Sequence, residues 1–101
     1  MEMVMAVVER YCWQPTDVEE FVGLHREFHD KHLKKAGASD MILWQDRSNW
    51  KVYIAEVWFE NFAALDRWDA HFETEEAKEF GVRINAAATL IERVQYTRVD
   101  Y

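Results

Sequence analysis

The sequence predicts an α+β domain whose elements follow the order strand, helix, strand, strand, helix, strand. Three observations lead to this order. Four stretches rich in β-branched and aromatic residues are typical of strands, two stretches have the apolar spacing of amphipathic helices, and turn residues separate them. This is the ferredoxin-like pattern, in which one antiparallel-rich sheet carries both helices on a single face. With 101 residues, one domain is expected over residues 1–101.

The first strand and the first helix are separated by a short turn. The strand is expected over Met3–Trp13 and the helix over Pro15–Ala36. Thr16 or Asp17 is the expected N-cap, and Gly37 suits the end of the helix. Alternate residues of the strand share one face, namely Met3, Met5, Val7, Glu9 and Tyr11.

Two further strands follow, and the second of them is the most hydrophobic. They are expected over Ser39–Asp46 and Trp50–Phe59, with a turn at residues 47–49. Apolar side chains on both faces of Trp50–Phe59 predict a central strand that is covered on both sides. Helices cover only one face in this fold, so a second copy of the chain is expected to close over the other.

The second helix is expected to begin after Asn61 and to break near Thr74. It resumes as Glu75–Phe80, and no element is assigned to residues 81–88. A last strand is expected over Leu90–Asp100. These elements complete the predicted βαββαβ order.

The first helix has an unusual stripe, because three histidines lie on the face that should be apolar. Imidazole suits a packed face only where each ring finds a hydrogen-bond partner. The stripe therefore predicts a partly polar pocket between this helix and the sheet. At about 100° per residue its members fall within roughly 60° of one direction; they are Val18, Phe21, Val22, His25, Phe28, His29, His32 and Ala36.

The spacing of these histidines permits a metal site as an alternative. His25 and His29 are four residues apart, and His29 and His32 are three apart, so either pair can chelate one ion. His25 and His32 are about 10.5 Å apart along the helix axis, which is too far for one ion to take all three. Two histidines with Glu56 or Glu9 form a 2-His-1-carboxylate set, which suits iron or zinc.

Charge and composition exclude several classes of partner. The chain has 12 basic and 19 acidic residues, a net charge of −7, whereas nucleic acids and anionic membranes select basic surfaces. Neither is expected as a partner. Cys12 is the only cysteine, so no intrachain disulfide forms. No targeting segment and no run of about 18 apolar residues is present, and a cytoplasmic location is expected.

The second half of the chain resembles the antibiotic-biosynthesis-monooxygenase-like family of dimeric α+β barrels. The resemblance rests on WFENFAAL from Trp58, on Trp68, and on HFETEEAKEF from His71. In that family the third strand ends in a tryptophan and an acidic and alanine-containing segment opens the helix. A histidine one turn on then precedes a short break and a second helical piece. Strand order and length agree over nearly the whole chain.

The resemblance implies a homodimer closed through the sheet faces, with a pocket between sheet and helices in each subunit. Members of this family include cofactor-free oxygenases acting on quinols and polyphenols, haem-degrading enzymes, and many proteins without an established activity. The haem-degrading members place a haem-ligating histidine about where Ala77 stands and an asparagine near the position of Glu9. The resemblance therefore points away from haem and implies no cofactor.

By the same resemblance, Trp58 points into the pocket. Alternation along the strand then places Glu56, Ile54 and Val52 on the same face. Glu56 lies between two apolar residues, where a carboxylate loses water and becomes a suitable general base or acid. The alternatives are a structural carboxylate paired with an imidazole or an arginine, and an edge position left in water.

The candidate site residues fall into two groups. The catalytic candidates are Glu56, His25, His29 and His71. Large aromatic side chains are expected to form an apolar slot for a ring system, and the substrate-contacting candidates are Trp58, Trp68, His32, Phe28, Phe72 and Glu9.

Three functions remain open from the sequence. The first is a cofactor-independent monooxygenase, in which a histidine or Glu56 removes a proton from a planar phenol or quinol and the resulting anion reacts with dioxygen. The second is an enzyme or binding protein whose metal is held by His25, His29, His32 and Glu56 in some combination. The third is a non-catalytic binding or stress-related barrel that holds a hydrophobic ligand or acts as a partner module.

Overall fold

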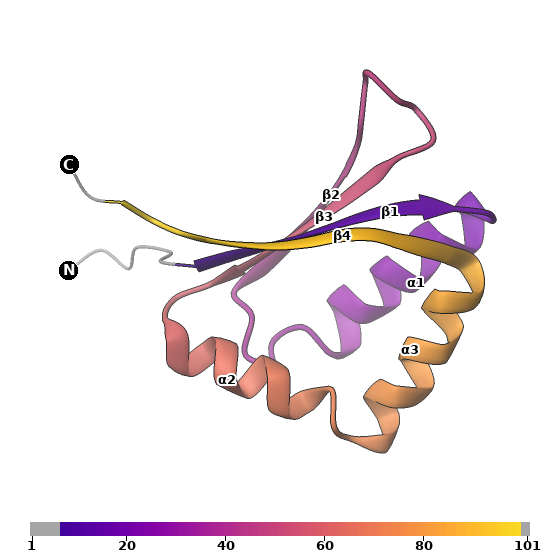
Figure 1. Cartoon of the computed structure of the whole chain (residues 1–101). Coiled ribbons are helices and arrows are strands. Elements are labelled where there is room, and N and C mark those ends of the chain that lie inside the picture. Colours follow the sequence, from indigo (N-terminus) through magenta and orange to yellow (C-terminus); the bar gives the residue numbers. More distant parts are fainter. Residues whose placement is uncertain (1–6, 100–101) are drawn as a thin grey trace.

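The predicted order of elements is confirmed, with the second helix divided in two. The computed structural model describes residues 7–99. In Figure 1 the three helices lie on one side of a four-stranded sheet. Its elements are β1 (Val7–Pro15), α1 (Val18–Lys31), β2 (Asp40–Gln45), β3 (Tyr53–Phe59), α2 (Phe62–His71), α3 (Glu75–Ala87) and β4 (Ala88–Thr97). The predicted strand residues 3–6 and 100 lie outside the described part.

The sheet has the strand order β2-β3-β1-β4, and every neighbouring pair is antiparallel. The first strand is therefore central, with Arg10 opposite Glu56 of β3 on one side and Val94 of β4 on the other. The β1–β4 register shifts between Cys12 and Trp13, where β4 has one extra residue. This pairing fixes which side chains share a face of the sheet.

The helix-covered face of β3 is the opposite of the one expected. Ala55, Val57 and Phe59 are buried beneath the helices, whereas Glu56 and Trp58 are half-buried on the other face. The alternation was predicted correctly and its phase was wrong. Both faces of this strand are apolar, so the residue pattern itself carries no information about which face meets the helices.

Helix α1 has one of the two expected N-caps but is shorter than predicted at both ends, because Pro15 belongs to β1 and the helix begins at Val18. Asp17 is the N-cap, and its side chain accepts a hydrogen bond from the backbone N–H of Glu20 at 3.0 Å. The helix ends at Lys31, and a series of turns carries the chain through Gly37, which has φ +100°. A Cβ at this glycine would lie 2.7 Å from the carbonyl oxygen of Ala64. Gly37 therefore permits close approach of this connection to α2.

The break between the helices follows from their caps. Asn61 caps α2 and Thr74 caps α3, each accepting a bond from the backbone N–H three residues later. Residues 81–88, to which the sequence assigned no element, continue α3 to Ala87 and begin β4 without a loop. The reason is that Phe80 and Ile84 are both buried and extend one packing face of the helix.

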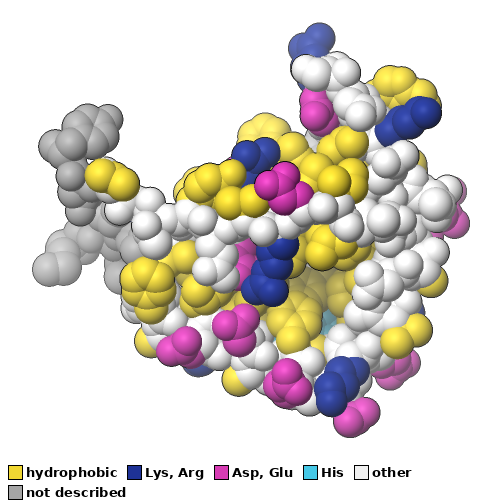
Figure 2. Space-filling view, viewed as in Figure 1, with side chains coloured by type: hydrophobic (Ala, Val, Ile, Leu, Met, Phe, Trp, Pro, Cys, Tyr) yellow, Lys and Arg dark blue, Asp and Glu magenta, His cyan; other side chains and the backbone are white. Residues whose placement is uncertain are grey.

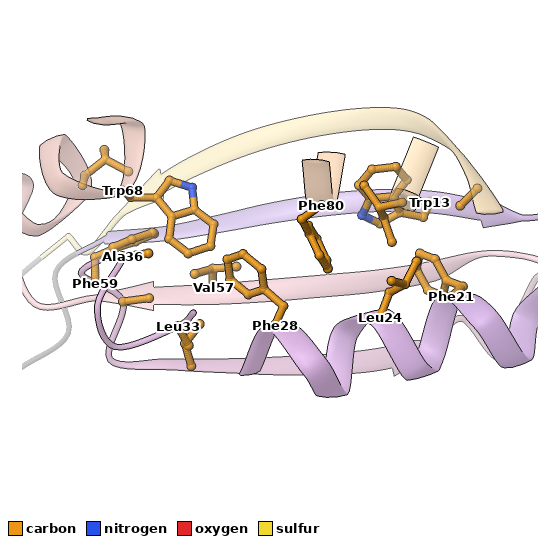
Figure 3. Packing of buried hydrophobic residues seen from close by; sticks show 14 of the residues in the cluster. Trp13, Phe21, Leu24, Phe28, Leu33, Ala36, Val57, Phe59, Trp68 and Phe80 are labelled. Carbon is orange, nitrogen blue, oxygen red and sulfur yellow. The ribbon is translucent and has the colours of Figure 1, made fainter. Parts of the chain in front are cut away.

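The hydrophobic core fills the layer between the sheet and the helices. Figure 3 shows Trp68 and Phe59 at one end of this layer, Trp13 and Phe21 at the other, and Phe28 between them. None of the described helices is long and apolar enough to cross a membrane. The cytoplasmic location stays a prediction.

Candidate functional site

A hollow of about 610 Å³ lies between the helix-covered face of the sheet and the helices. Figure 2 shows it in the space-filling view, with hydrophobic side chains inside, a histidine at its depth, and charged side chains around its edge. This hollow lies where the histidine stripe predicts a partly polar pocket, and its role as a ligand site stays a prediction. Aromatic side chains from both strands and helices line it, namely Tyr11, Trp13, Phe28, Trp68, Phe72 and Phe80.

The aromatic rings of the hollow hold one another in place. Phe28 and Phe72 are almost parallel, with an interplanar angle of 3° and centroids 6.1 Å apart. Trp68 stands edge-on to Phe72, at 71° and 4.9 Å. Small residues of β3, Ala55 and Val57, form part of the opposite wall. Rings arranged in this way present flat apolar surfaces to a planar ligand.

His25 is a buried polar side chain that lines the hollow. Its residue is only 9% exposed, and Nδ1 lies 2.9 Å from the backbone carbonyl oxygen of Phe21. A carbonyl oxygen only accepts, so Nδ1 carries the proton and Nε2 keeps its lone pair in the neutral ring. Burial lowers the pKa of His25, against a smaller opposing effect of the Phe21 hydrogen bond. The ring is therefore neutral at pH 7.

Glu9 lies beneath the hollow at the centre of a hydrogen-bond network. Its carboxylate is fully buried and accepts hydrogen bonds from the Tyr11 hydroxyl, from Arg93 Nη2 at 2.7 Å and from Gln95 Nε2 at 2.6 Å. Trp68 Nε1 donates to the Tyr11 oxygen at 3.1 Å. Burial, then the bond to Glu9, raises the pKa of Tyr11. Tyr11 and Arg93 line the hollow, so Glu9 fixes two of its polar side chains.

The edge of the hollow is charged and exposed. Arg93 Nη2 lies 3.7 Å from Asp69 Oδ1, and its guanidinium is 5.4 Å from the centre of the Tyr11 ring. Glu73 and Asn85 line the same edge. The carboxylates of Asp69 and Glu73 outnumber the guanidinium of Arg93, whose charge Glu9 already neutralises. The mouth therefore favours a neutral ligand over an anionic one.

His32 and His71 lie behind the aromatic wall. His32 is buried, stacks on Phe28 with centroids 5.2 Å apart, and has Nδ1 3.4 Å from Glu76 Oε1. The His71 ring is 5.7 Å from that of His32, and its Nε2 is buried with no hydrogen-bond partner among the described residues. Burial, then the charge of His32, lowers the pKa of His71. Neither ring lines the hollow.

Four of the predicted site residues line the hollow together, and the rest do not. His25, Phe28, Trp68 and Phe72 share it, whereas Glu9 lies beneath it and His32 and His71 lie behind its wall. Glu56 and Trp58 are on the helix-free face, where Trp44 Nε1 donates to Glu56 Oε1 at 2.9 Å. The placement of Glu56 and Trp58 in the pocket was therefore wrong. The hydrogen-bond partner of Glu56 is an indole N–H, and not the arginine or imidazole of the structural alternative.

His29 also lies away from the hollow. Its side chain is 49% exposed, with Nδ1 3.1 Å from Asp30 and Nε2 3.8 Å from Asp40. The predicted stripe left out Leu24, which is buried. At about 100° per residue, including Leu24 turns the centre of the stripe away from His29.

The metal alternative does not assemble in the described part of the chain. No group of three histidine, cysteine, aspartate or glutamate side chains is placed to hold an ion there. His29 points to solvent, and Glu56 lies on the far side of the sheet from His25. The 2-His-1-carboxylate set inferred from the spacing is therefore wrong.

Several residues of the hollow were missed by sequence reasoning. Arg93 and Leu90 belong to β4 and Asn85 to the unassigned stretch, so neither their facing nor their distance from the first helix was predictable. Tyr11 had a usable signal, because it shares a strand face with Glu9 two residues earlier.

No family model matches this chain, and no curated protein matches it either. Solved structures do match. SnoaB, a cofactor-independent oxygenase from Streptomyces nogalater, superposes with a TM-score of 0.78 over 97% of each chain at 13% identity. A conserved protein from Methanosarcina mazei gives a TM-score of 0.76 over 94% of each chain at 19% identity.

A protein from Deinococcus radiodurans classed as an antibiotic biosynthesis monooxygenase gives a TM-score of 0.67 over 94% of each chain at 11% identity. The chain therefore has the fold of the antibiotic biosynthesis monooxygenases, as the resemblance implied. At these identities the likeness establishes the fold alone.

Proposed function

We propose that this protein is an oxygenase that takes a planar phenol or quinol into the hollow and uses His25 to remove the hydroxyl proton. The observation that carries the proposal is the imidazole of His25: a neutral ring, held through Nδ1 by the Phe21 carbonyl, beside an aromatic hollow. No described residue forms a hydrogen bond with its Nε2. That nitrogen is free to accept a proton from a ligand.

The hollow suits an aromatic ligand. Phe28, Phe72 and Trp68 offer ring faces and edges on which a planar system stacks or packs edge-on. The polar groups are few and are placed at the depth and the edge, which is the usual composition of a small-molecule site. The net-acidic edge disfavours anionic ligands and admits neutral phenols.

The reaction class follows from the likeness in fold together with this base. Transfer of the phenolic proton to His25 Nε2 leaves an electron-rich anion in a poorly hydrated site, and such an anion gives electrons to dioxygen. SnoaB is a cofactor-independent oxygenase of this fold. In the proposed scheme His25 supplies the proton transfer, and Phe28, Trp68 and Phe72 orient the ring.

Oxygen uptake tests the proposal. The full chain is mixed with 1,4-dihydroxynaphthalene in an oxygen electrode cell, and the uncatalysed uptake is subtracted. His25→Gln keeps a donor for the Phe21 carbonyl and removes the base, so uptake should fall by at least about 100-fold. His29→Gln is the matched control, because His29 is exposed and far from the hollow. Glu56→Gln should also leave uptake unchanged.

Equal rates for His25→Gln and His29→Gln would contradict the proposed role of His25. If the unchanged protein binds 1,4-dihydroxynaphthalene but takes up no oxygen, the result would instead favour a non-catalytic barrel that holds a hydrophobic ligand. Native mass spectrometry of the purified protein distinguishes a retained apolar passenger from an empty protein.

We also propose that the protein is a homodimer whose subunits meet through the helix-free face of the sheet. Large apolar side chains lie unpacked there: Trp44 is 53% exposed, Tyr96 is 45% exposed and Ile42 is 37% exposed. Exposed large apolar side chains on one face of a sheet are typical of an interface. Figure 1 shows no element of the described chain over this face.

A further inference from the structure

Helix α3 contains a glycine where neither the backbone nor a close neighbour requires one. Gly81 lies in the middle of α3, half-buried, and lines the hollow. A Cβ built on Gly81 has no atom within 4 Å. Among the described residues only Gly37 has a positive φ, so any L-residue could adopt the conformation of Gly81. Glycine is a poor helix former at such a position, and alanine is better there.

The space in front of Gly81 belongs to the hollow. Phe80 and Ile84, on the same side of α3, are buried and line it. Asn85, one turn later, also lines the hollow, and its Nδ2 donates to the Gly81 carbonyl oxygen at 2.8 Å. A side chain at position 81 would therefore project into the ligand space between two lining residues.

The size of the hollow indicates what that space is for. At about 610 Å³, it lies within the range of roughly 300–1,000 Å³ that is usual for pockets holding drug-sized molecules. A single benzene ring leaves much of such a volume empty. A fused-ring system occupies more of it, and one that extends along the aromatic wall toward α3 comes against Gly81.

We infer that Gly81 is a specificity-determining residue: its missing side chain admits fused-ring phenols, which a larger residue would exclude while still admitting single-ring phenols. The inference rests on the proposal that the hollow binds a planar phenol, and it adds the width of that ligand. A methyl group at position 81 overpacks the contact with a wide ligand and leaves a narrow one untouched.

The chain offers a matched control. Gly23 is also a helix-interior glycine, in α1, and a Cβ placed there would have no atom within 4 Å, but it is exposed and does not line the hollow. The same substitution at the two positions has the same effect on helix propensity. Gly81→Ala and Gly23→Ala should each raise Tm by about 4 °C. Only the substitution at Gly81 should change binding.

The experiment measures binding by the quenching of tryptophan fluorescence, since Trp13 and Trp68 line the hollow. The probes are 1,8-dihydroxyanthraquinone, which has three fused rings and is already oxidised, and 4-methylphenol, which has one. Gly81→Ala should weaken binding of the three-ring probe about tenfold, and Gly81→Leu should abolish it. Both should bind 4-methylphenol as the unchanged protein does. Gly23→Ala and Gly23→Leu should bind both probes normally.

Equal affinity of Gly81→Leu and Gly23→Leu for the three-ring probe would overturn the inference. So would equal weakening of both probes, or failure of the unchanged protein to bind the three-ring probe. Because this probe is not turned over, the result is independent of oxygen uptake. Suppose that Gly81→Leu loses binding of the three-ring probe alone and that the unchanged protein takes up no oxygen. The specificity role of Gly81 would then stand, and the oxygenase proposal would be rejected.

Discussion

Glu9 and Arg93 form an ion pair across two strands, with Arg93 Nη2 2.7 Å from Glu9 Oε2. The carboxylate is fully buried, and the guanidinium is 44% exposed at the edge of the hollow. Tyr11 and Gln95 complete the donors to Glu9. The pair therefore connects the middle of the sheet to the mouth of the candidate site, and both its partners come from strands that pair along their length.

Removing the cationic partner should be costly. Arg93→Met leaves the Glu9 carboxylate buried with only the neutral donors Tyr11 and Gln95. An uncompensated buried charge typically lowers the free energy of unfolding by about 3 kcal/mol, which urea denaturation measures. Arg26→Met, at an exposed position of α1, is the control and should change it by less than about 0.5 kcal/mol. Equal losses in the two variants would contradict the role of the pair.

The free energy of unfolding should decrease as the pH is lowered below about 6.5, the pKa of an unperturbed histidine. Burial lowers the pKa of both His25 and His71 in the folded protein. The unfolded chain therefore binds protons at these residues first as pH falls, which favours unfolding. Below about pH 6.5, each histidine lowers the free energy of unfolding by up to about 1.4 kcal/mol for each pH unit. Above pH 7 this loss is absent.

Urea denaturation between pH 7.5 and pH 5.5 measures this dependence. His25→Gln and His71→Gln should each flatten the curve, because each removes a group that the unfolded chain protonates more readily. His29→Gln, at an exposed position, should leave the slope as it is. A slope that survives the double variant His25→Gln/His71→Gln would show that other groups cause it.

The dimer should depend on the helix-free face. Trp44→Glu places a charge among exposed apolar side chains of β2 and should convert the dimer to a monomer at micromolar concentration, as measured by sedimentation. Trp50→Glu is the matched control, because Trp50 is 70% exposed in the β2–β3 connection, outside the sheet. A monomeric unchanged protein, or equal dissociation of both variants, would reject this interface.

Gly37 should not tolerate a side chain. Its φ of +100° strains any L-residue, and a Cβ there would lie 2.7 Å from the Ala64 carbonyl oxygen. Gly37→Ala should therefore lower the free energy of unfolding by about 2 kcal/mol. Gly23→Ala, free of both constraints, should raise it by about 0.5 kcal/mol. Thermal unfolding of the two variants gives opposite shifts of Tm if this account is right, and parallel shifts if it is not.

The order of elements was predictable from sequence because the signals are local. Asp17, Asn61 and Thr74 each mark a helix start, since a side-chain oxygen accepts a nearby backbone N–H that the helix leaves free. The end of α1 was less predictable. The turns after Lys31 depend on the docking of Gly37 against α2, which is a long-range contact.

The candidate site was predictable in part. His25 and Phe28 follow from the helical period alone, and both line the hollow. Arg93 and Gly81 do not follow from any local pattern, because their place in the hollow depends on the pairing of β4 with β1 and on the packing of α3.

Local patterns are enough to assign the elements, their order and the alternation of side chains along β3, since backbone geometry sets a period of two in any strand. The phase of that alternation depends on how the folded chain packs. Glu56 and Ala55 are adjacent, and each is flanked by apolar residues on its own face, so only the side of the sheet on which the helices pack assigns one to the outer face and the other to the hollow. That choice depends on burial against distant elements, which no local pattern encodes.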